Sequence, residues 1–205
     1  MTGRPTDAVI VDSGGANLAS LQFALQRLGA TSMVTADPET IRRAQRVVLP
    51  GVGSAADAMA RLGQAGLDRV LPALRQPVLG ICLGMQLLYD RSEEGATACL
   101  GIVPGTVQRL EPAPGRAVPH MGWNRVHARE RHALLDGIDD GAHFYFVHSY
   151  AAPVTAESIA LTDYGADLTA IVRQGNFLGT QFHPERSGPV GARLLANFLR
   201  LAPCS

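Results

Sequence analysis

The stretch over residues 77–89, PVLGICLGMQLLY, places a cysteine at the point where a buried strand is predicted to turn into a helix. Val78, Leu79 and Ile81 are apolar, as in a short buried strand, and the residues after Cys82 repeat at helical spacing. Glycines two positions before and two after Cys82 remove the side chains that would collide at so sharp a turn. The pattern is that of a nucleophile elbow, with Cys in the place of Ser. Such a corner holds its central residue in a strained backbone conformation.

A thiol at this position would also be activated electrostatically. The unpaired N–H groups at a helix N-terminus favour the thiolate of Cys82, and the N–H of Leu83 would point at the group under attack. The alternative for Cys82 is a buried structural role, because free cysteine is among the most buried residue types.

The elements around this elbow predict an α/β fold. Before it, apolar strands alternate with amphipathic helices, which indicates parallel pairing. From about residue 100 the pattern changes to short strands and turns, ending in a strand over 177–182 and an amphipathic helix over 189–201. We therefore predict one domain over residues 1–205, with an open, mixed, mostly parallel sheet flanked by helices and a strand-rich second half. The Gly-rich loop over 50–54 should reach the same sheet edge as Cys82, where α/β proteins bind ligands.

A cysteine nucleophile needs a base to move its proton and a partner to orient that base. His183 and Glu185 follow the last predicted strand and lie two residues apart, so in an extended chain both would project to one side. Pro184 is expected to keep this segment from forming a helix. Taken singly, His183 is the kind of histidine that lies in an ordinary turn and Glu185 is an ordinary surface charge. Together with the elbow they indicate a Cys-His-Glu triad.

Composition excludes several other classes of function. Lys plus Arg equals Asp plus Glu at 18 each, and no basic run marks a nucleic-acid surface. No apolar run approaches 18 residues and no leader pattern opens the chain, so neither export nor membrane insertion is expected. An odd number of cysteines, three, favours a reducing compartment, and we expect a cytoplasmic protein in which Cys99 and Cys204 have no catalytic role.

The residues around the triad also resemble a known family. The stretch GICLGMQ over 80–86 and HPE over 183–185 are similar to the triad of the triad-type glutamine amidotransferases. Further stretches resemble the branch formed by the glutaminase subunits of imidazole glycerol phosphate synthase: DSGGANL over 12–18, LPGVG over 49–53, HMGWN over 120–124, FVHSY over 146–150 and QFHPERS over 181–187. Sister glutaminases of anthranilate or GMP synthesis usually carry His at position 85, where this chain has Met85.

The resemblance implies roles for individual residues. Cys82 would be the nucleophile, His183 the acid and base, and Glu185 the residue that orients it. The resemblance implies further positions: Gln86, Glu94, Ser149 and Tyr150 for binding glutamine, and Asn17, Trp123, Asn124 and Arg186 for the interface with a cyclase subunit. Arg186 replaces a frequent Lys. The alternative for Trp123 is a place in the core of the strand-rich half.

This resemblance implies hydrolysis of glutamine, with ammonia passed to a cyclase subunit in a heterodimer that makes imidazole glycerol phosphate and AICAR in histidine biosynthesis. The oxyanion at each tetrahedral stage would be held by the N–H of Leu83 and one N–H from the turn of Val52 and Gly53. We expect no metal and no organic cofactor. The alternatives are the glutaminase subunit of another amidotransferase, a thiol hydrolase or peptidase, and a regulatory subunit without catalysis.

Overall fold

The structure, a computed structural model, describes residues 6–14 and 18–202. In the first part of the chain, up to and including the elbow, strands and helices alternate in the order β1 (Ala8–Val11), α1 (Leu18–Arg27), β2 (Ser32–Thr35), α2 (Pro38–Arg43), β3 (Val47–Gly51), α3 (Ala55–Gln64), α4 (Leu67–Val70), η1 (Leu71–Ala73), β4 (Val78–Cys82) and α5 (Leu83–Gln86). The second part is built mainly of strands: β5 (Tyr89–Ser92), η2 (Glu94–Ala96), β6 (Thr97–Ala98), β7 (Val103–Arg109), β8 (His120–Ala128), η3 (Ala133–Leu135), β9 (Ala142–His148), β10 (Tyr150–Ala151), β11 (Ser158–Asp163), β12 (Asp167–Gln174), β13 (Phe177–Thr180), η4 (Pro184–Arg186) and α6 (Gly188–Phe198).

Nine strands form the main sheet, in the order β2-β1-β3-β4-β13-β12-β11-β8-β9. Pairing is parallel from β2 to β13 and antiparallel from β13 to β9. In register, Gly51 lies beside Cys82 and Ile81 beside Thr180. The carboxyl ends of β3, β4 and β13 therefore meet at one edge, as predicted for the site.

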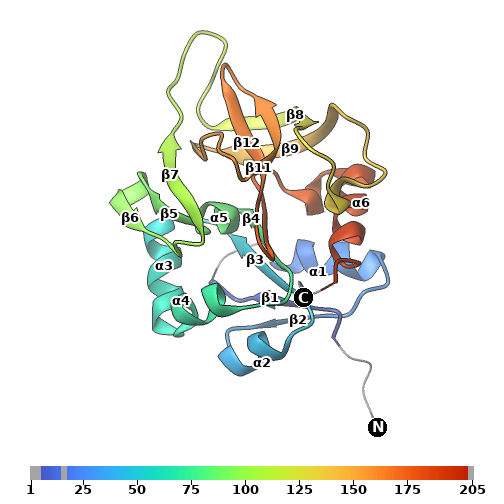
Figure 1. The fold of residues 1–205 in the computed structure, drawn as a ribbon. Coiled ribbons are helices and arrows are strands. Elements are labelled where there is room, and N and C mark those ends of the chain that lie inside the picture. The colour runs from blue at the N-terminus through green and yellow to red at the C-terminus, as the bar shows by residue number, and fades with distance from the viewer. Residues whose placement is uncertain (1–5, 15–17, 203–205) are drawn as a thin grey trace.

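Two apolar layers cover the two faces of this sheet, which Figure 1 shows between α3 and α4 on one side and α1 and α6 on the other. Side chains of β1 alternate between the layers: Val9 and Val11 pack with α3 and α4, whereas Ala8 and Ile10 pack with α1 and α6. The predicted α/β class with a mixed sheet flanked by helices is confirmed, since helices cover both faces, as parallel strands require. The main sheet is not mostly parallel, however, because four of its eight neighbouring strand pairs are antiparallel.

The second part of the chain adds a smaller sheet that the sequence did not predict. Its strand order is β10-β7-β5-β6, with β5 and β7 parallel and the other pairs antiparallel. Figure 1 shows this sheet beside α3, on the α3 and α4 side of the molecule. Tyr150 in β10 and Glu94 in η2, between β5 and β6, line the site described below.

Several predicted element boundaries were wrong. The helix after Cys82 does not continue to Tyr89 but ends at Gln86, because the chain turns into β5. Among the short strands of the second half, β9 and β10 are separated by an interruption at Ser149. The final helix ends at Phe198 rather than at residue 201. Such errors are typical where hydrogen bonding to a distant strand, rather than local pattern, ends an element.

None of the helices within residues 6–14 and 18–202 combines the length and the apolar character that crossing a bilayer requires.

Candidate active site

The elbow forms as the sequence predicts. Cys82 ends β4 and has φ 54° and ψ −112°, a conformation that non-glycine residues rarely adopt. The residue is 9% exposed and lines the cavity described below. Strain of this kind costs on the order of 1–3 kcal/mol and is kept where the surrounding structure enforces it.

The two glycines around Cys82 are required by close backbone packing. A Cβ on Gly80 would lie 2.6 Å from the carbonyl oxygen of Gly84, and a Cβ on Gly84 would lie 1.8 Å from the carbonyl oxygen of Leu49. No side chain fits at either position without moving backbone. The first turn of α5 is thus pressed against the end of β3, which brings the N-terminus of α5 beside the loop after Gly51.

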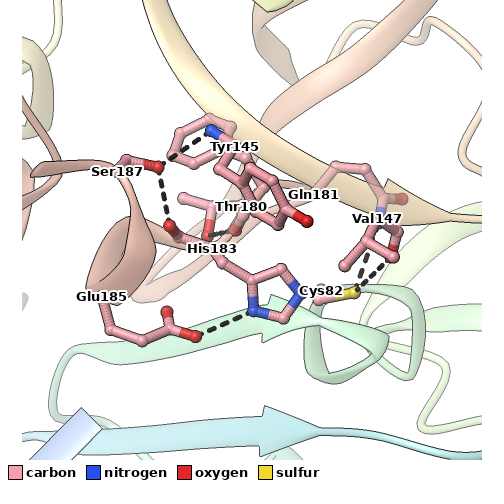
Figure 2. A network of polar contacts seen from close by, with 9 residues as sticks. Cys82, Tyr145, Val147, Thr180, Gln181, His183, Glu185 and Ser187 are labelled. Atoms are coloured by element: carbon pink, nitrogen blue, oxygen red, sulfur yellow. Dashed lines mark hydrogen bonds and ion pairs between the residues drawn. The ribbon is translucent and has the colours of Figure 1, made fainter. Parts of the chain in front are cut away.

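His183 and Glu185 meet behind the sulfur. The Nδ1 atom of His183 lies 2.8 Å from Oε1 of Glu185, and their side chains are only 9% and 5% exposed. Because the carboxylate accepts from Nδ1–H, the Nε2 side of the ring is the one free to face Cys82. Figure 2 shows the ring between the carboxylate and the sulfur in this orientation.

The predicted extended conformation of this segment was wrong. Pro184 does not block a helix but begins the 3₁₀ helix η4, where its fixed φ suits the first helical position. The Oγ of Ser187 accepts from the N–H of Tyr145 and donates to the carbonyl of His183, at 3.0 and 2.7 Å. These hydrogen bonds hold the turn against β9. The side chains of His183 and Glu185 therefore meet because the backbone curves through η4, and not because alternate residues of a strand point to the same side.

The electrostatic environment stabilises a protonated His183. Burial by itself lowers the pKa of this imidazole, but hydrogen bonds to Cys82 and Glu185, together with their negative charges, raise it to about 10. An imidazolium in this position stabilises a neighbouring thiolate. The three side chains thus have the arrangement of a nucleophile, a proton carrier and an orienting acid.

Two further groups contact the sulfur and had no predicted role. The Nε2 atom of Gln181 is 3.9 Å from Sγ of Cys82, and Sγ is 3.8 Å from the carbonyl oxygen of Val147. Figure 2 shows both on the side of the sulfur away from Glu185. Gln181 lies in a stretch that the sequence analysis singled out, but its spacing alone does not indicate a contact with Cys82.

A cavity of about 770 Å³ opens over the sulfur. Its wall brings together every residue predicted to act on or bind the substrate: Cys82, His183, Leu83, Val52, Gly53, Gln86, Glu94, Ser149 and Tyr150 line it, and Glu185 lies behind His183. Leu83 opens α5, so its N–H belongs to the first turn that has no partner within the helix. Gly53, with φ 90°, shapes the facing loop.

Gln86 is only 4% exposed, so it is not an ordinary amide on the surface of a helix. Its Nε2 donates to the carbonyl of Tyr150 at 2.7 Å and to Oε1 of Gln181 at 2.9 Å. Both amide hydrogens are thus engaged, and Oε1 is the atom that Gln86 can offer to a ligand. Glu94 is half-buried, and its Oε2 accepts from the N–H of Ala55 at 2.7 Å. Neither side chain is a freely rotating surface group.

The residues predicted for the partner interface are partly brought together. Trp123 is 55% exposed, so its alternative as a core residue is wrong. It makes an edge contact with Tyr145 at 6.0 Å between ring centroids, and the guanidinium of Arg186 lies 4.7 Å from the centroid of the same ring. Asn124 is half-buried and donates to the carbonyl of Asp163. Asn17 lies outside the described residues. Tyr145, which joins Trp123 to Arg186, carried no signal in the sequence analysis.

Comparisons with known proteins agree with this geometry. A family model described as "Glutamine amidotransferase class-I" matches residues 9–202. The chain is 52% identical over 197 residues to a protein of Xanthomonas euvesicatoria pv. vesicatoria named imidazole glycerol phosphate synthase subunit HisH, covering 96% of this chain and 98% of that protein. The HisH subunit of Xylella fastidiosa is 53% identical over 196 residues, with the same coverage.

Solved structures show the same fold at low sequence identity. A protein of Thermoplasma acidophilum described as a putative GMP synthase subunit has a TM-score of 0.72 at 18% identity, over 94% of this chain and 91% of that chain. A structure described as a glutamine amidotransferase has a TM-score of 0.70 at 21% identity, over 93% and 96% of the two chains.

Proposed function

This chain belongs to the class-I glutamine amidotransferase family, within its HisH branch, and from that premise we propose that it is the glutaminase subunit of imidazole glycerol phosphate synthase. It hydrolyses glutamine to glutamate and ammonia. The observation that carries the proposal is the strained Cys82 at the floor of a cavity, with the buried His183 and Glu185 pair beside it.

The reaction follows from the placement of these three groups. The sulfur of Cys82 attacks the carboxamide carbon of glutamine while His183 holds the thiol proton. Collapse of the tetrahedral adduct breaks the C–N bond, and His183 gives that proton to the departing amide nitrogen, which leaves as ammonia. Water then attacks the thioester, His183 takes a proton from it, and glutamate leaves as the proton returns to the sulfur. Glu185 orients the ring and stabilises the imidazolium.

The negative charge that develops on the former carbonyl oxygen needs donors in place. We assign this role to the N–H of Leu83 and to an N–H of Val52 or Gly53, which line the cavity close to the sulfur. Loss of one such donor typically lowers kcat by roughly 10²- to 10³-fold. The close packing of Gly84 on Leu49 supports the assignment, because it holds the two backbone segments against each other.

The remaining wall residues suit the polar end of glutamine. Gln86 Oε1 and the free carboxylate oxygen of Glu94 are acceptors that suit an ammonium group. Ser149, at the interruption between β9 and β10, and Tyr150, which begins β10, both line the cavity. We assign these four residues to glutamine binding.

Ammonia released into neutral water would become ammonium and lose its nucleophilicity, so the product must pass directly to a second active site. The curated relatives are named as synthase subunits. We propose that the partner is the cyclase subunit, which binds at the exposed cluster of Trp123, Tyr145 and Arg186 and makes imidazole glycerol phosphate and AICAR in the cytoplasm. Arg and Trp are the residue types most often found as binding anchors.

A glutaminase assay of the chain alone and with the cyclase subunit tests the proposal. Glutamate should form from glutamine, at a higher rate in the complex. Asparagine should not be hydrolysed to aspartate, because its shorter side chain places the carboxamide away from the sulfur. Hydrolysis of thiol-reactive esters or peptides without glutamine turnover would identify a thiol hydrolase. A complex that forms but turns over no glutamine would identify a regulatory subunit without catalysis.

A further inference from the structure

Two buried histidines beside the cavity are not used by the proposed reaction. His120 on β8 and His148 on β9 are 3% and 6% exposed and are register partners in the sheet. Nδ1 of His120 lies 2.9 Å from Nε2 of His148. The ring of His120 also stacks on Tyr164 at 3.9 Å and on Phe146 at 4.8 Å between centroids.

The partners at the two ends of this pair fix the position of every ring proton. Nδ1 of His148 lies 2.8 Å from the carbonyl oxygen of Tyr150, and a carbonyl only accepts, so Nδ1 carries a proton. In the neutral ring Nε2 of His148 must then accept, and Nδ1 of His120 must donate. That leaves Nε2 of His120 as an acceptor, and it lies 3.3 Å from the Nδ2 donor of Asn124.

The pair is connected to the glutamine site through one carbonyl. The oxygen of Tyr150 accepts both from His148 and from Nε2 of Gln86, at 2.8 and 2.7 Å. Gln86 also donates to the side-chain carbonyl of Gln181, whose amide nitrogen lies next to the sulfur of Cys82. The bond from His148 to Tyr150 also closes a loop around Ser149, at the place where the strand is interrupted and its backbone faces the cavity.

We infer that His120 and His148 are positioning residues: as a neutral pair with fixed tautomers, they hold the Tyr150 carbonyl, and through it Gln86 and Ser149, in the geometry that binds glutamine. The inference rests on the proposed glutaminase function. Burial favours the neutral rings, lowering the pKa of His148 to about 3 and that of His120 to about 4. A proton added to Nε2 of His148 would turn two N–H groups toward each other across the 2.9 Å contact, and one added to Nε2 of His120 would face the amide donor of Asn124 at 3.3 Å.

Two substitutions of His120 separate hydrogen bonding from packing. His120→Phe keeps an aromatic ring between Phe146 and Tyr164 but removes the donor to His148. His120→Asn removes the ring but places an amide donor near the former Nδ1. Measured in the complex with the cyclase subunit, His120→Phe should raise KM for glutamine about tenfold and change kcat by less than about threefold, because ground state and transition state lose the same binding.

His120→Asn should lie closer to wild type in KM than His120→Phe. The matched control is His127→Phe, also on β8 but with a side chain that is 53% exposed, which should leave KM unchanged. An unchanged KM in His120→Phe, or an equal rise in both His120 variants, overturns the positioning role. Turnover with added ammonia, which bypasses glutamine, should be unaffected in all three.

Nitrogen-15 NMR of the wild-type histidines provides a second test that does not depend on a variant folding. At pH 7 both rings should be neutral, with Nδ1 protonated and Nε2 unprotonated. A protonated ring or an Nε2–H tautomer at either residue would contradict the inference. If the wild-type complex fails to hydrolyse glutamine, the proposed function falls, whereas the NMR result still decides the tautomers.

Discussion

Gly84→Ala should inactivate the glutaminase without unfolding the chain. The new Cβ would lie 1.8 Å from the carbonyl oxygen of Leu49, whereas a carbon normally stays about 3.3 Å or more from such an oxygen. To remove this clash, α5 and the end of β3 must move apart by about 1.5 Å. That shift separates the N–H of Leu83 from the loop of Val52 and Gly53. A misplacement of about 1 Å can lower a rate about 100-fold, so we expect at least that loss in kcat.

The assay compares glutamine-dependent and ammonia-dependent synthesis by the complex, together with a thermal melt of the isolated glutaminase chain. Overpacking should lower the free energy of unfolding by about 1–3 kcal/mol. Gly63→Ala is the control: it lies in α3, a Cβ there meets nothing within 4 Å, and alanine should stabilise the helix by about 0.5–1 kcal/mol without affecting catalysis. A folded Gly84→Ala variant with glutamine turnover within threefold of wild type would refute the packing argument.

Other predictions concern the proton carrier and the partner surface. Glu185→Gln should lower kcat by roughly 10³- to 10⁴-fold with little change in KM, and an unchanged kcat would reduce the triad to a dyad. Since the pKa of His183 is raised from 6.5 to about 10, its stabilising contribution is complete below pH 6.5 and lost as pH approaches 10. The difference in melting temperature between wild type and Glu185→Gln should therefore shrink over that range, and a constant difference would contradict the assignment. Trp123→Ala and Arg186→Glu should each weaken cyclase binding at least about tenfold in a titration without lowering the melting temperature, and an unchanged affinity in both would reject the interface.

The sequence could predict the elbow because its determinants are local. Cys82 and its flanking glycines define a backbone path that few other patterns need, and the strained φ is observed. The spacing of His183 and Glu185 also identified a true contact, although the predicted reason was wrong. The pair meets in a 3₁₀ turn that hydrogen bonds of His183 and Ser187 with Tyr145 hold in place, and the bond between Ser187 and Tyr145 links residues 42 positions apart in the sequence.

The rest of the site depends on contacts that no local pattern encodes. Gln181 reaches the sulfur only because β13 pairs with β4, and Tyr145 joins Trp123 to Arg186 only because β9 lies beside β8 and η4. The pairing of His148 with His120 carries no local signal either, because the two residues are 28 positions apart. Tertiary pairing, rather than residue type, makes these residues part of the site.

The central claim, that Cys82 is the nucleophile acting on glutamine, is tested most directly by Cys82→Ser in the complex with the cyclase subunit. Glutamine-dependent synthesis should fall below detection, while ammonia-dependent synthesis and affinity for the cyclase should stay within twofold of wild type, because in the proposed heterodimer the cyclase site lies on the other chain. Glutamine-dependent turnover that survives the substitution would contradict the account.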